Sequence, residues 1–327
     1  MESPTAIHRV AIIGAGYMGG GMAQVFAMGG LDVVVADVDA ATAEQAARRI
    51  VDDASSWERE GLFPQGATQD CRARITAAAS IEAACEVSDY IAEVVSERLS
   101  VKEDVLSRIG GSARSDAIIS SNTSAIPIST LAEFVVNPER FVGVHWMNPA
   151  PFVPAVEIIP TPQTSPWVTD AVEALLTANG KATSRVSDGA GFVANRLQFA
   201  LFHEAARMVD EGVATPALID DVVMNSFGFR LPFFGPFAGA DMAGLDVYVG
   251  AYESLSRAYG PRFAPPECLS EQVAQGHLGL KSGAGFRKVD AEKVGDLVRY
   301  RNRAYAALEA LRRELGPSPF NAEPGSD

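Results

Sequence analysis

The spacing of apolar residues along the chain changes near residue 190. Before that point, short apolar runs of strand length alternate with segments in which apolar residues recur at helical spacing. After it, the helical spacing continues without strands. Strands that alternate with helices are typical of a parallel sheet with helices on both faces. We therefore expect an α/β architecture, with a doubly wound Rossmann domain over residues 1–188 and an all-α domain over 189–327.

The same patterns place the individual elements. Strands are predicted at 8–13, 32–36, 73–76, 90–95, 117–120, 141–145, 155–159 and 181–186. Helices of the first domain are predicted at 17–29, 40–61, 98–109 and 166–178, and a further one opens at Pro127. In the second domain, helices are predicted at 192–211, 215–226, 241–259, 267–275 and 289–315, and no structure is expected beyond Gly316.

A glycine-rich turn joins the first strand to the first helix. It has the form G-x-G-x-x-G and consists of Gly14, Ala15, Gly16, Tyr17, Met18 and Gly19. Glycines at these three positions allow a tight turn, a close approach of a pyrophosphate, and close packing of the helix on the strand. The helix N-terminus then presents free N–H groups and a positive dipole end to the phosphates. The turn therefore predicts a dinucleotide cofactor, with the motif residues as its contacts.

An acidic residue at the end of the second strand indicates which dinucleotide is bound. Asp37 directly follows the apolar run 32–36. A carboxylate at this point accepts hydrogen bonds from a ribose 2′-hydroxyl, and it repels the 2′-phosphate of NADP. Asp39 is an alternative carboxylate for the same role. The sequence therefore predicts NAD rather than NADP.

A histidine and a glutamate stand in two apolar strands that a proline-containing loop connects. His145 ends the first of these strands and Glu157 lies in the middle of the second. A carboxylate in an apolar strand is costly to bury unless it has a partner. If the strands fold back on each other, Glu157 meets His145, fixes its tautomer and raises its basicity, as in a general base. The alternative is an edge hairpin with both side chains in water.

Polar side chains also gather at the ends of other predicted elements. Glu93, Glu97 and Lys102 lie where a strand ends and the next helix starts, and the sequence SNTS at 121–124 follows another strand. Ligands of open parallel sheets bind at this carboxyl edge. Asn195 lies one turn into the first helix of the second domain. A solvated charged turn at Glu93 and a water-exposed helical turn at Asn195 are the alternatives.

Composition narrows the classes of partner. The net charge of −14 argues against nucleic acid and anionic membranes. The three cysteines have neither metal-binding nor redox spacing, so we expect no metal site and a reduced, cytoplasmic protein. The sequence shows no signal peptide and no apolar run of membrane-spanning length. The expected partner is a small-molecule substrate.

Six motifs together resemble the L-3-hydroxyacyl-CoA dehydrogenase superfamily along nearly the whole chain. They are GAGYMG at 14–19, SERLSVK at 96–102, SNTS at 121–124, HWMNP…VEII within 145–159, GFVANR at 191–196 and GLKSGAGF at 279–286. Their order and spacing both agree with that family. The segments around VEII and GFVANR look closer to the lambda-crystallin/L-gulonate 3-dehydrogenase and pyridine-carboxylate dehydrogenase branches, whereas GLKSGAGF is common in CoA-using members.

The resemblance implies roles for individual residues. The family's catalytic base, its orienting carboxylate and its two substrate contacts fall on His145, Glu157, Ser124 and Asn195, in that order. Its nicotinamide-side contacts fall on Glu97, Lys102 and Asn122. It also implies a homodimer that forms through the helical second domain.

Two departures from the family pattern bear on the substrate. The usual HFFNP is HWMNP here, and Trp146, Met147 and Phe152 are expected to line the space for the substrate body. The region 48–75, where CoA-using members place basic residues, has five arginines and no lysine.

The expected function is an NAD-dependent oxidation of a 3-hydroxy acid or a 3-hydroxyacyl-CoA. A small free acid such as L-gulonate, carnitine or a pyridine carboxylate is the alternative substrate. The 6-phosphogluconate and 3-hydroxyisobutyrate type of dehydrogenase requires a catalytic lysine after a glycine-rich segment, and none follows Gly191 before Arg196. A non-catalytic, crystallin-like NAD-binding protein is the alternative from another class, but the His145, Glu157, Ser124 and Asn195 set argues against it.

Overall fold

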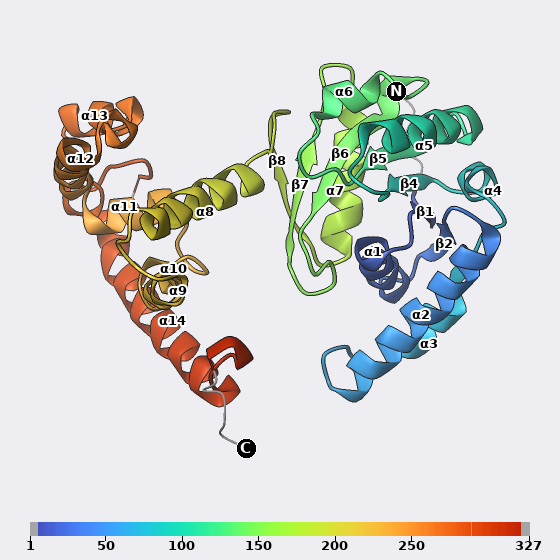
Figure 1. The fold of residues 1–327 in the computed structure, drawn as a ribbon, viewed down its shortest axis with the longest axis horizontal. Coiled ribbons are helices and arrows are strands. Elements are labelled where there is room, and N and C mark those ends of the chain that lie inside the picture. Colours follow the sequence, from blue (N-terminus) through green and yellow to red (C-terminus); the bar gives the residue numbers. More distant parts are fainter. Residues whose placement is uncertain (1–5, 289, 322–327) are drawn as a thin grey trace. The chain divides into compact units, whose positions relative to one another are not determined.

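The chain forms two compact units, Met1–Phe202 and His203–Asp327, shown in Figure 1. The computed structural model describes residues 6–288 and 290–321. The division between the units falls within helix α8 (Ala194–Asp210), which begins in the first unit and ends in the second.

The first unit is built on an eight-stranded sheet with the order β3-β2-β1-β4-β5-β6-β7-β8. Its strands are β1 (Arg9–Ile13), β2 (Asp32–Ala36), β3 (Ile75–Ala77), β4 (Tyr90–Glu93), β5 (Ile118–Ser121), β6 (Phe141–Trp146), β7 (Ala155–Ile159) and β8 (Ala182–Arg185). All neighbouring strands are parallel except β6 and β7, which are antiparallel. The order reverses between β1 and β4, as in a doubly wound sheet, so the predicted Rossmann architecture is confirmed.

Helices cover both faces of this sheet, and each face has its own hydrophobic core. On one face lie α1 (Tyr17–Met28), α2 (Ala40–Arg59), α3 (Ala67–Arg74) and α7 (Pro166–Ala178). On the other lie α4 (Ile81–Glu86), α5 (Leu99–Ser112) and α6 (Ile128–Ala132). A 3₁₀ turn, η1 (Pro138–Arg140), precedes β6. Because side chains of a strand point alternately to the two faces, the central strands contribute to both cores.

Two helices of the first unit differ from the sequence-based expectation. The helix predicted at 40–61 ends at Arg59, and the short helix α3 follows it. Helix α4 was not predicted, because it is a single short stretch without visible periodicity. The Ser80 side chain caps it by accepting a hydrogen bond from the Ala83 N–H, which is the kind of local signal that a periodicity search misses.

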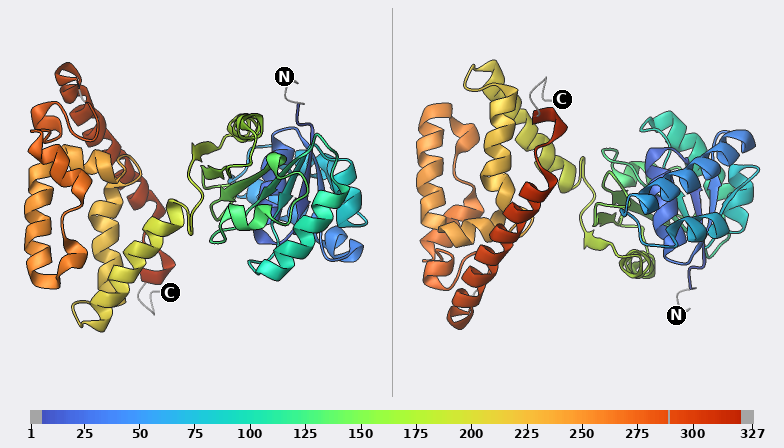
Figure 2. Two further views of the ribbon diagram at one scale, coloured as in Figure 1. Left: turned by 90° about the horizontal axis from the view of Figure 1, so that it is seen from above. Right: turned by 90° about the horizontal axis from the view of Figure 1, so that it is seen from below.

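The second unit is helical, as predicted, and the long helix α14, red in Figure 2, runs the length of it. After α8 come α9 (Pro216–Asn225), α10 (Phe227–Arg230), α11 (Pro236–Ala243), α12 (Leu245–Tyr259), α13 (Glu267–Ala274) and α14 (Val294–Leu315). Short 3₁₀ turns lie at Pro261–Phe263, Leu280–Ser282, Ala291–Lys293 and Pro319–Asn321. The last of these lies within the tail expected to lack structure, and residues 322–327 of that tail are outside the described residues.

One predicted helix of the second unit is in fact two. The stretch 241–259 is divided by Gly244, whose φ of +106° lies in a region that side-chain-bearing residues rarely adopt. Helix α11 therefore ends at Ala243, and α12 begins at Leu245 in a new direction.

No helix within residues 6–288 and 290–321 has the length and apolar content needed to cross a membrane.

Candidate active site

The glycine turn after β1 has the geometry that its sequence predicts. Gly14 has a φ of +98°, and a Cβ there would lie 2.7 Å from the Val94 carbonyl oxygen. A Cβ on Gly19 would lie 2.1 Å from the Gly14 carbonyl oxygen, so helix α1 could not pack against the turn with any larger residue. Gly16, by contrast, has no atom within 4 Å of the place where a Cβ would be. The space beside Gly16 at the start of α1 therefore fits a pyrophosphate group.

Asp37 is the carboxylate beside this turn. Its Oδ2 accepts a hydrogen bond of 2.9 Å from the Ala15 N–H, and its Oδ1 accepts one of 2.8 Å from the Val38 N–H. Asp39 is used differently, because it caps α2 by accepting a 2.7 Å hydrogen bond from the Thr42 N–H. The Thr42 contacts lower the pKa of Asp39. The geometry therefore favours Asp37 over Asp39 as the residue that meets the adenosine ribose of a dinucleotide.

His145 and Glu157 lie directly opposite each other in the antiparallel pair β6–β7. The distance between His145 Nδ1 and Glu157 Oε2 is 2.9 Å, and both side chains are buried. With Nδ1 donating to the carboxylate, Nε2 carries the free lone pair of the imidazole. The ring also packs against Phe192, with 5.5 Å between the two ring centroids. The pairing proposed from the sequence is therefore formed, and Nε2 is the atom available to take a proton.

The other oxygen of Glu157 binds the start of helix α8. Oε1 accepts hydrogen bonds from the backbone N–H groups of Val193, at 3.0 Å, and Ala194, at 2.9 Å. These donors satisfy a buried carboxylate that would otherwise be costly. They also place Asn195, the next residue, near the sheet. No sequence pattern predicts these backbone contacts, because any residue type can provide them.

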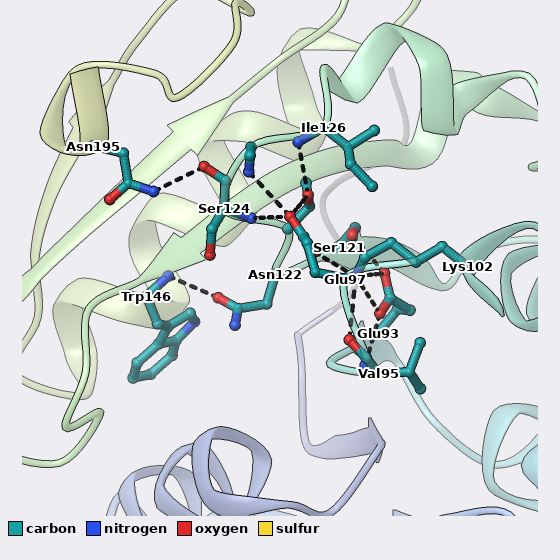
Figure 3. A network of polar contacts seen from close by, with 12 residues as sticks. Glu93, Val95, Glu97, Lys102, Ser121, Asn122, Ser124, Ile126, Trp146 and Asn195 are labelled. Atoms are coloured by element: carbon teal, nitrogen blue, oxygen red, sulfur yellow. Dashed lines mark hydrogen bonds and ion pairs between the residues drawn. The ribbon is translucent and has the colours of Figure 1, made fainter. Parts of the chain in front are cut away.

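The SNTS loop after β5 is held near the base by two further hydrogen bonds, shown in Figure 3. Asn122 Oδ1 accepts from the Trp146 N–H at 2.8 Å, immediately after the base in the chain. Asn195 Nδ2 donates to the Ser124 carbonyl oxygen at 2.9 Å. The Ser124 hydroxyl has no hydrogen-bond partner among the side chains and backbone of residues 6–288 and 290–321. The structure therefore brings Ser124, Asn122 and Asn195 together and leaves a hydroxyl free to contact a ligand.

Glu97 and Lys102, predicted as cofactor contacts, occupy different environments. The Glu97 side chain is 39% exposed, whereas that of Lys102 is 1% exposed. Glu97 Oε1 accepts from the Thr123 hydroxyl and from the Ser124 and Ala125 N–H groups. Burial opposes its ionisation, but these donors and the nearby Lys102 ammonium hold the pKa of Glu97 below its ordinary value. The Lys102 ammonium is enclosed by protein groups, and Glu97 is the member of the pair that a ligand can reach.

The position of Trp146 corrects the expectation that it lines the substrate space. Trp146 is 2% exposed and packs edge-on against Phe26, with 5.5 Å between ring centroids. Strand β6 runs one residue further than predicted, so Trp146 points to the face opposite His145. Phe152 is 44% exposed, but its ring packs against Trp57.

A buried lysine that the sequence did not single out fixes the loop after the base. Lys181, just before β8, donates to the carbonyl oxygens of Ala150, at 2.5 Å, and Val153, at 3.0 Å. Its ammonium also lies 5.2 Å from the centroid of the Trp146 ring. Burial lowers the pKa of Lys181. The loop that follows the base is therefore anchored from β8, and only the folded structure reveals this contact, since Lys181 belongs to no motif.

Comparison with known proteins identifies the family. The model of the 3-hydroxyacyl-CoA dehydrogenase NAD-binding domain matches residues 9–189, and that of the 3-hydroxyacyl-CoA dehydrogenase C-terminal domain matches 191–289. The chain is 33% identical to 5-formyl-3-hydroxy-2-methylpyridine 4-carboxylate 5-dehydrogenase of Mesorhizobium japonicum, covering 93% of this chain and 98% of the relative. It is 36% identical to L-carnitine dehydrogenase of Pseudomonas putida, covering 94% and 95%.

A solved structure agrees with this assignment over both units. The 3-hydroxyacyl-CoA dehydrogenase of Archaeoglobus fulgidus is similar with a TM-score of 0.76 and 31% identity, covering 94% of this chain and 99% of that one. The geometry of the glycine turn and of Asp37 fits a dinucleotide, which such an enzyme needs. The chain therefore belongs to the 3-hydroxyacyl-CoA dehydrogenase family and is an NAD-dependent oxidoreductase that acts on a CH–OH group.

Proposed function

We propose that this dehydrogenase oxidises the secondary hydroxyl of a small 3-hydroxy acid, with His145 as the general base and Glu157 as the carboxylate that orients it. The observation that carries the proposal is the buried contact of 2.9 Å between His145 Nδ1 and Glu157 Oε2. It leaves Nε2 to accept the hydroxyl proton, and the carboxylate stabilises the imidazolium that results. NAD, when bound, supplies the hydride acceptor.

The remaining site residues hold the reacting groups. We assign the Ser124 hydroxyl and the Asn195 amide to the substrate oxygen. Asn195 follows Ala194, whose N–H group binds Glu157, and the Asn195 amide in turn binds the loop that carries Ser124. Holding that oxygen beside Nε2 is a positioning effect, which lowers the entropic cost of reaching the transition state. Asn122 and Glu97 are assigned to the nicotinamide side, and Gly14, Gly16, Tyr17, Met18, Gly19 and Asp37 to the rest of the dinucleotide.

The arginines between residues 48 and 74 favour a small free acid over a CoA thioester. Arg48 lies 3.6 Å from Glu44, and Arg74 lies 3.7 Å from Asp32. Arg49 donates to the carbonyl oxygens of Ala15 and Gly16 in the glycine turn. Arg59 donates to the Ser55 carbonyl oxygen, so four of the five arginines are engaged by the protein itself. With a net charge of −14, the chain has little basic surface left for the phosphates of CoA.

A CoA thioester is the second candidate, and one surface feature supports it. Arg59 and Arg72 both line a hollow of about 610 Å³ between α2 and α3. An open hollow with two guanidinium groups can bind phosphate. Its remaining lining is mixed, since it includes the Glu58 carboxylate.

A substrate panel separates the two candidates. The rate of NADH formation would be measured with L-gulonate, L-carnitine and 3-hydroxybutyryl-CoA, which carry secondary hydroxyls, and with a hydroxymethylpyridine carboxylate, which carries a primary one. We expect turnover with a free 3-hydroxy acid and little with the thioester or the primary alcohol. Preferential turnover of the thioester, lost when Arg59 and Arg72 are both replaced with alanine, would instead assign the enzyme to CoA substrates. Turnover of neither class would contradict the proposed function.

The choice of cofactor can be tested at Asp37. Asp37→Ala should weaken NAD binding and reduce discrimination against NADP by about tenfold or more, because a charged hydrogen-bonding group is lost and the repulsion of a 2′-phosphate disappears. The measurement is kcat/KM with each dinucleotide. Asp39→Ala is the control, since it removes only a helix cap and should lower stability slightly without changing the preference. Equal use of NADP by the parent enzyme would refute the assignment.

We infer that the enzyme is a homodimer formed through its helical domain, which we take to be residues 189–327, after an NAD-binding domain of 1–188. Within the described residues, the second unit has only six buried apolar side chains, and three of them, Ala240, Leu245 and Leu269, form one cluster. Large apolar side chains remain exposed on α9 and just after it, among them Leu218, Val222 and Leu231. An apolar surface of this kind is typical of an interface.

Light scattering after gel filtration tests the dimer. We expect a particle of twice the chain mass, and a shift toward the monomer for Val222→Asp, because a charge would be buried in the interface. Val136→Asp, at a similarly exposed apolar position of the first unit, should leave the dimer intact. A parent enzyme that runs as a monomer would contradict the inference.

The unpaired cysteines Cys71, Cys85 and Cys268 support a reducing location such as the cytoplasm.

A further inference from the structure

A fully buried glutamate lies beneath the SNTS loop without any assigned part in the chemistry. Glu93 is the last residue of β4 and is 0% exposed. Its carboxylate accepts hydrogen bonds from the Lys102 ammonium at 2.8 and 3.1 Å, from the Ser121 hydroxyl at 2.5 Å and from the Val95 N–H at 2.8 Å. Figure 3 shows these groups converging on the carboxylate from the loop after β4, from α5 and from the end of β5.

Lys102 connects Glu93 to Glu97, because its ammonium contacts both carboxylates. Its ammonium lies 3.4 Å from Glu97 Oε2 and 3.4 Å from the Val95 carbonyl oxygen. Lys102 therefore binds the beginning, the middle and the end of the segment that joins β4 to α5. It stands in the first turn of α5, where the helix dipole disfavours a cation, so the two carboxylates are needed to keep the ammonium there.

Glu97 in turn fixes the loop that carries the predicted substrate contact. Its Oε1 accepts from the Thr123 hydroxyl at 2.5 Å and from the N–H groups of Ser124 at 2.8 Å and Ala125 at 3.0 Å. Three donors on one oxygen leave this loop little freedom. A continuous series of contacts thus leads from Glu93 through Lys102 and Glu97 to the backbone of Ser124.

Stability alone is a poor explanation for such an arrangement. Taking two charges out of water costs several kcal/mol per ion, and well-packed apolar residues in the place of a buried ion pair are often as stable or more so. What apolar residues could not provide is a directional contact that fixes the Glu97 carboxylate. The contribution of Glu93 is therefore to the position of the site residues rather than to the stability of the fold.

We propose that Glu93 is a positioning residue for the dehydrogenase reaction, acting through Lys102 and Glu97 on the loop that bears Ser124. The inference rests on the proposed function, because it takes Ser124 as a contact of the substrate oxygen. Glu93 touches neither substrate nor cofactor in this role. It sets the place of the groups that do.

The first test compares a substitution of Glu93 with one of a neighbouring buried polar residue. Glu93→Gln keeps the size of the side chain but turns an amide toward the ammonium, so Glu97 and the loop lose their fixed position. Because small misplacements at a reacting centre can cost about 10²-fold, we expect kcat to fall between tenfold and a hundredfold while the KM for the hydroxy acid changes little. Ser120→Ala is the control. It removes a buried hydrogen bond of 2.7 Å to the Tyr90 hydroxyl, one residue before Ser121 in the same strand, and should keep kcat within about twofold.

A double variant separates positioning from simple charge compensation. Glu93→Gln combined with Lys102→Met removes both charges, so it should recover the thermal stability lost in the single variant. If Glu93 only neutralises Lys102, kcat recovers as well, and the proposal is overturned. If Glu93 positions Glu97 through Lys102, the melting temperature recovers but kcat stays low and matches that of Lys102→Met alone, because both variants lack the contact with Glu97. A double variant slower than Lys102→Met would show that Glu93 acts by another route and would also overturn the proposal. Where the single variant does not fold, the double variant alone gives this result.

Failure of the role proposed for Glu93 can be told apart from failure of the proposed function. A His145→Ala enzyme without turnover, beside a Glu93→Gln enzyme that works like Ser120→Ala, would overturn the role of Glu93 and leave the role of His145 intact. A His145→Ala enzyme with normal turnover would remove both.

Discussion

Replacement of His145 with alanine is expected to lower kcat by about 10²–10⁴-fold, which is the usual contribution of a general base. In the proposed mechanism, the imidazole Nε2, which faces away from Glu157, accepts the hydroxyl proton. NAD binding should be unchanged, because the glycine turn and Asp37, which follow β1 and β2, form no hydrogen bond with His145. Steady-state turnover and calorimetric titration with NAD measure the two effects.

The control for this variant is a histidine outside the site. His277 is in the second unit and pairs with Gln272, so His277→Ala should keep kcat near that of the parent. Turnover close to the parent value in His145→Ala would show that another group takes the proton. Loss of NAD affinity along with turnover would point to a structural role for the imidazole.

Replacement of Glu157 with glutamine is expected to lower kcat by about 10²-fold or more. The carbonyl oxygen of the new amide can still accept from Val193 and Ala194 at the start of α8. Its NH₂ group then faces His145 Nδ1, which must become an acceptor, and the ring proton moves to Nε2. The base is left in the wrong tautomer while the fold keeps its contacts. Turnover should therefore fall much more than the melting temperature.

Two further variants define this effect. Glu157→Asp retains the negative charge on a shorter side chain, so it should retain more activity than the amide. Glu173→Gln removes a surface carboxylate on α7 that pairs with Arg185 on β8, and it should change turnover little. If Glu157→Gln and Glu173→Gln have equal turnover, Glu157 does not set the tautomer of His145.

The part of the site that could be predicted from the sequence is the part fixed by local rules. The glycine turn follows from three positions that tolerate no side chain or require open space, and all three lie within one turn. The meeting of His145 and Glu157 follows from two apolar strands with a short connection, for which an antiparallel pairing is the simple solution. Both features need only nearby residues, so a linear pattern contains them.

The features that escaped prediction depend on contacts between distant segments. Lys181 meets the loop after the base only because β8 pairs with β7, and Glu93 meets Ser121 only because β4 pairs with β5. The error at Trp146 had a smaller cause. The strand was predicted to end at residue 145, so the next side chain was treated as part of a loop rather than as the alternate, inward-facing position of the strand.

The single antiparallel pair in the sheet also affects how the enzyme can evolve. The register of β6 and β7 sets His145 opposite Glu157, whatever the length or composition of the connection over 147–154. We expect substitutions in that connection, away from Ala150 and Val153, whose carbonyl oxygens Lys181 holds, to change what binds beside His145 while the His145–Glu157 contact stays in place. Segment 147–154 is therefore where we would look for variants that accept another hydroxy acid.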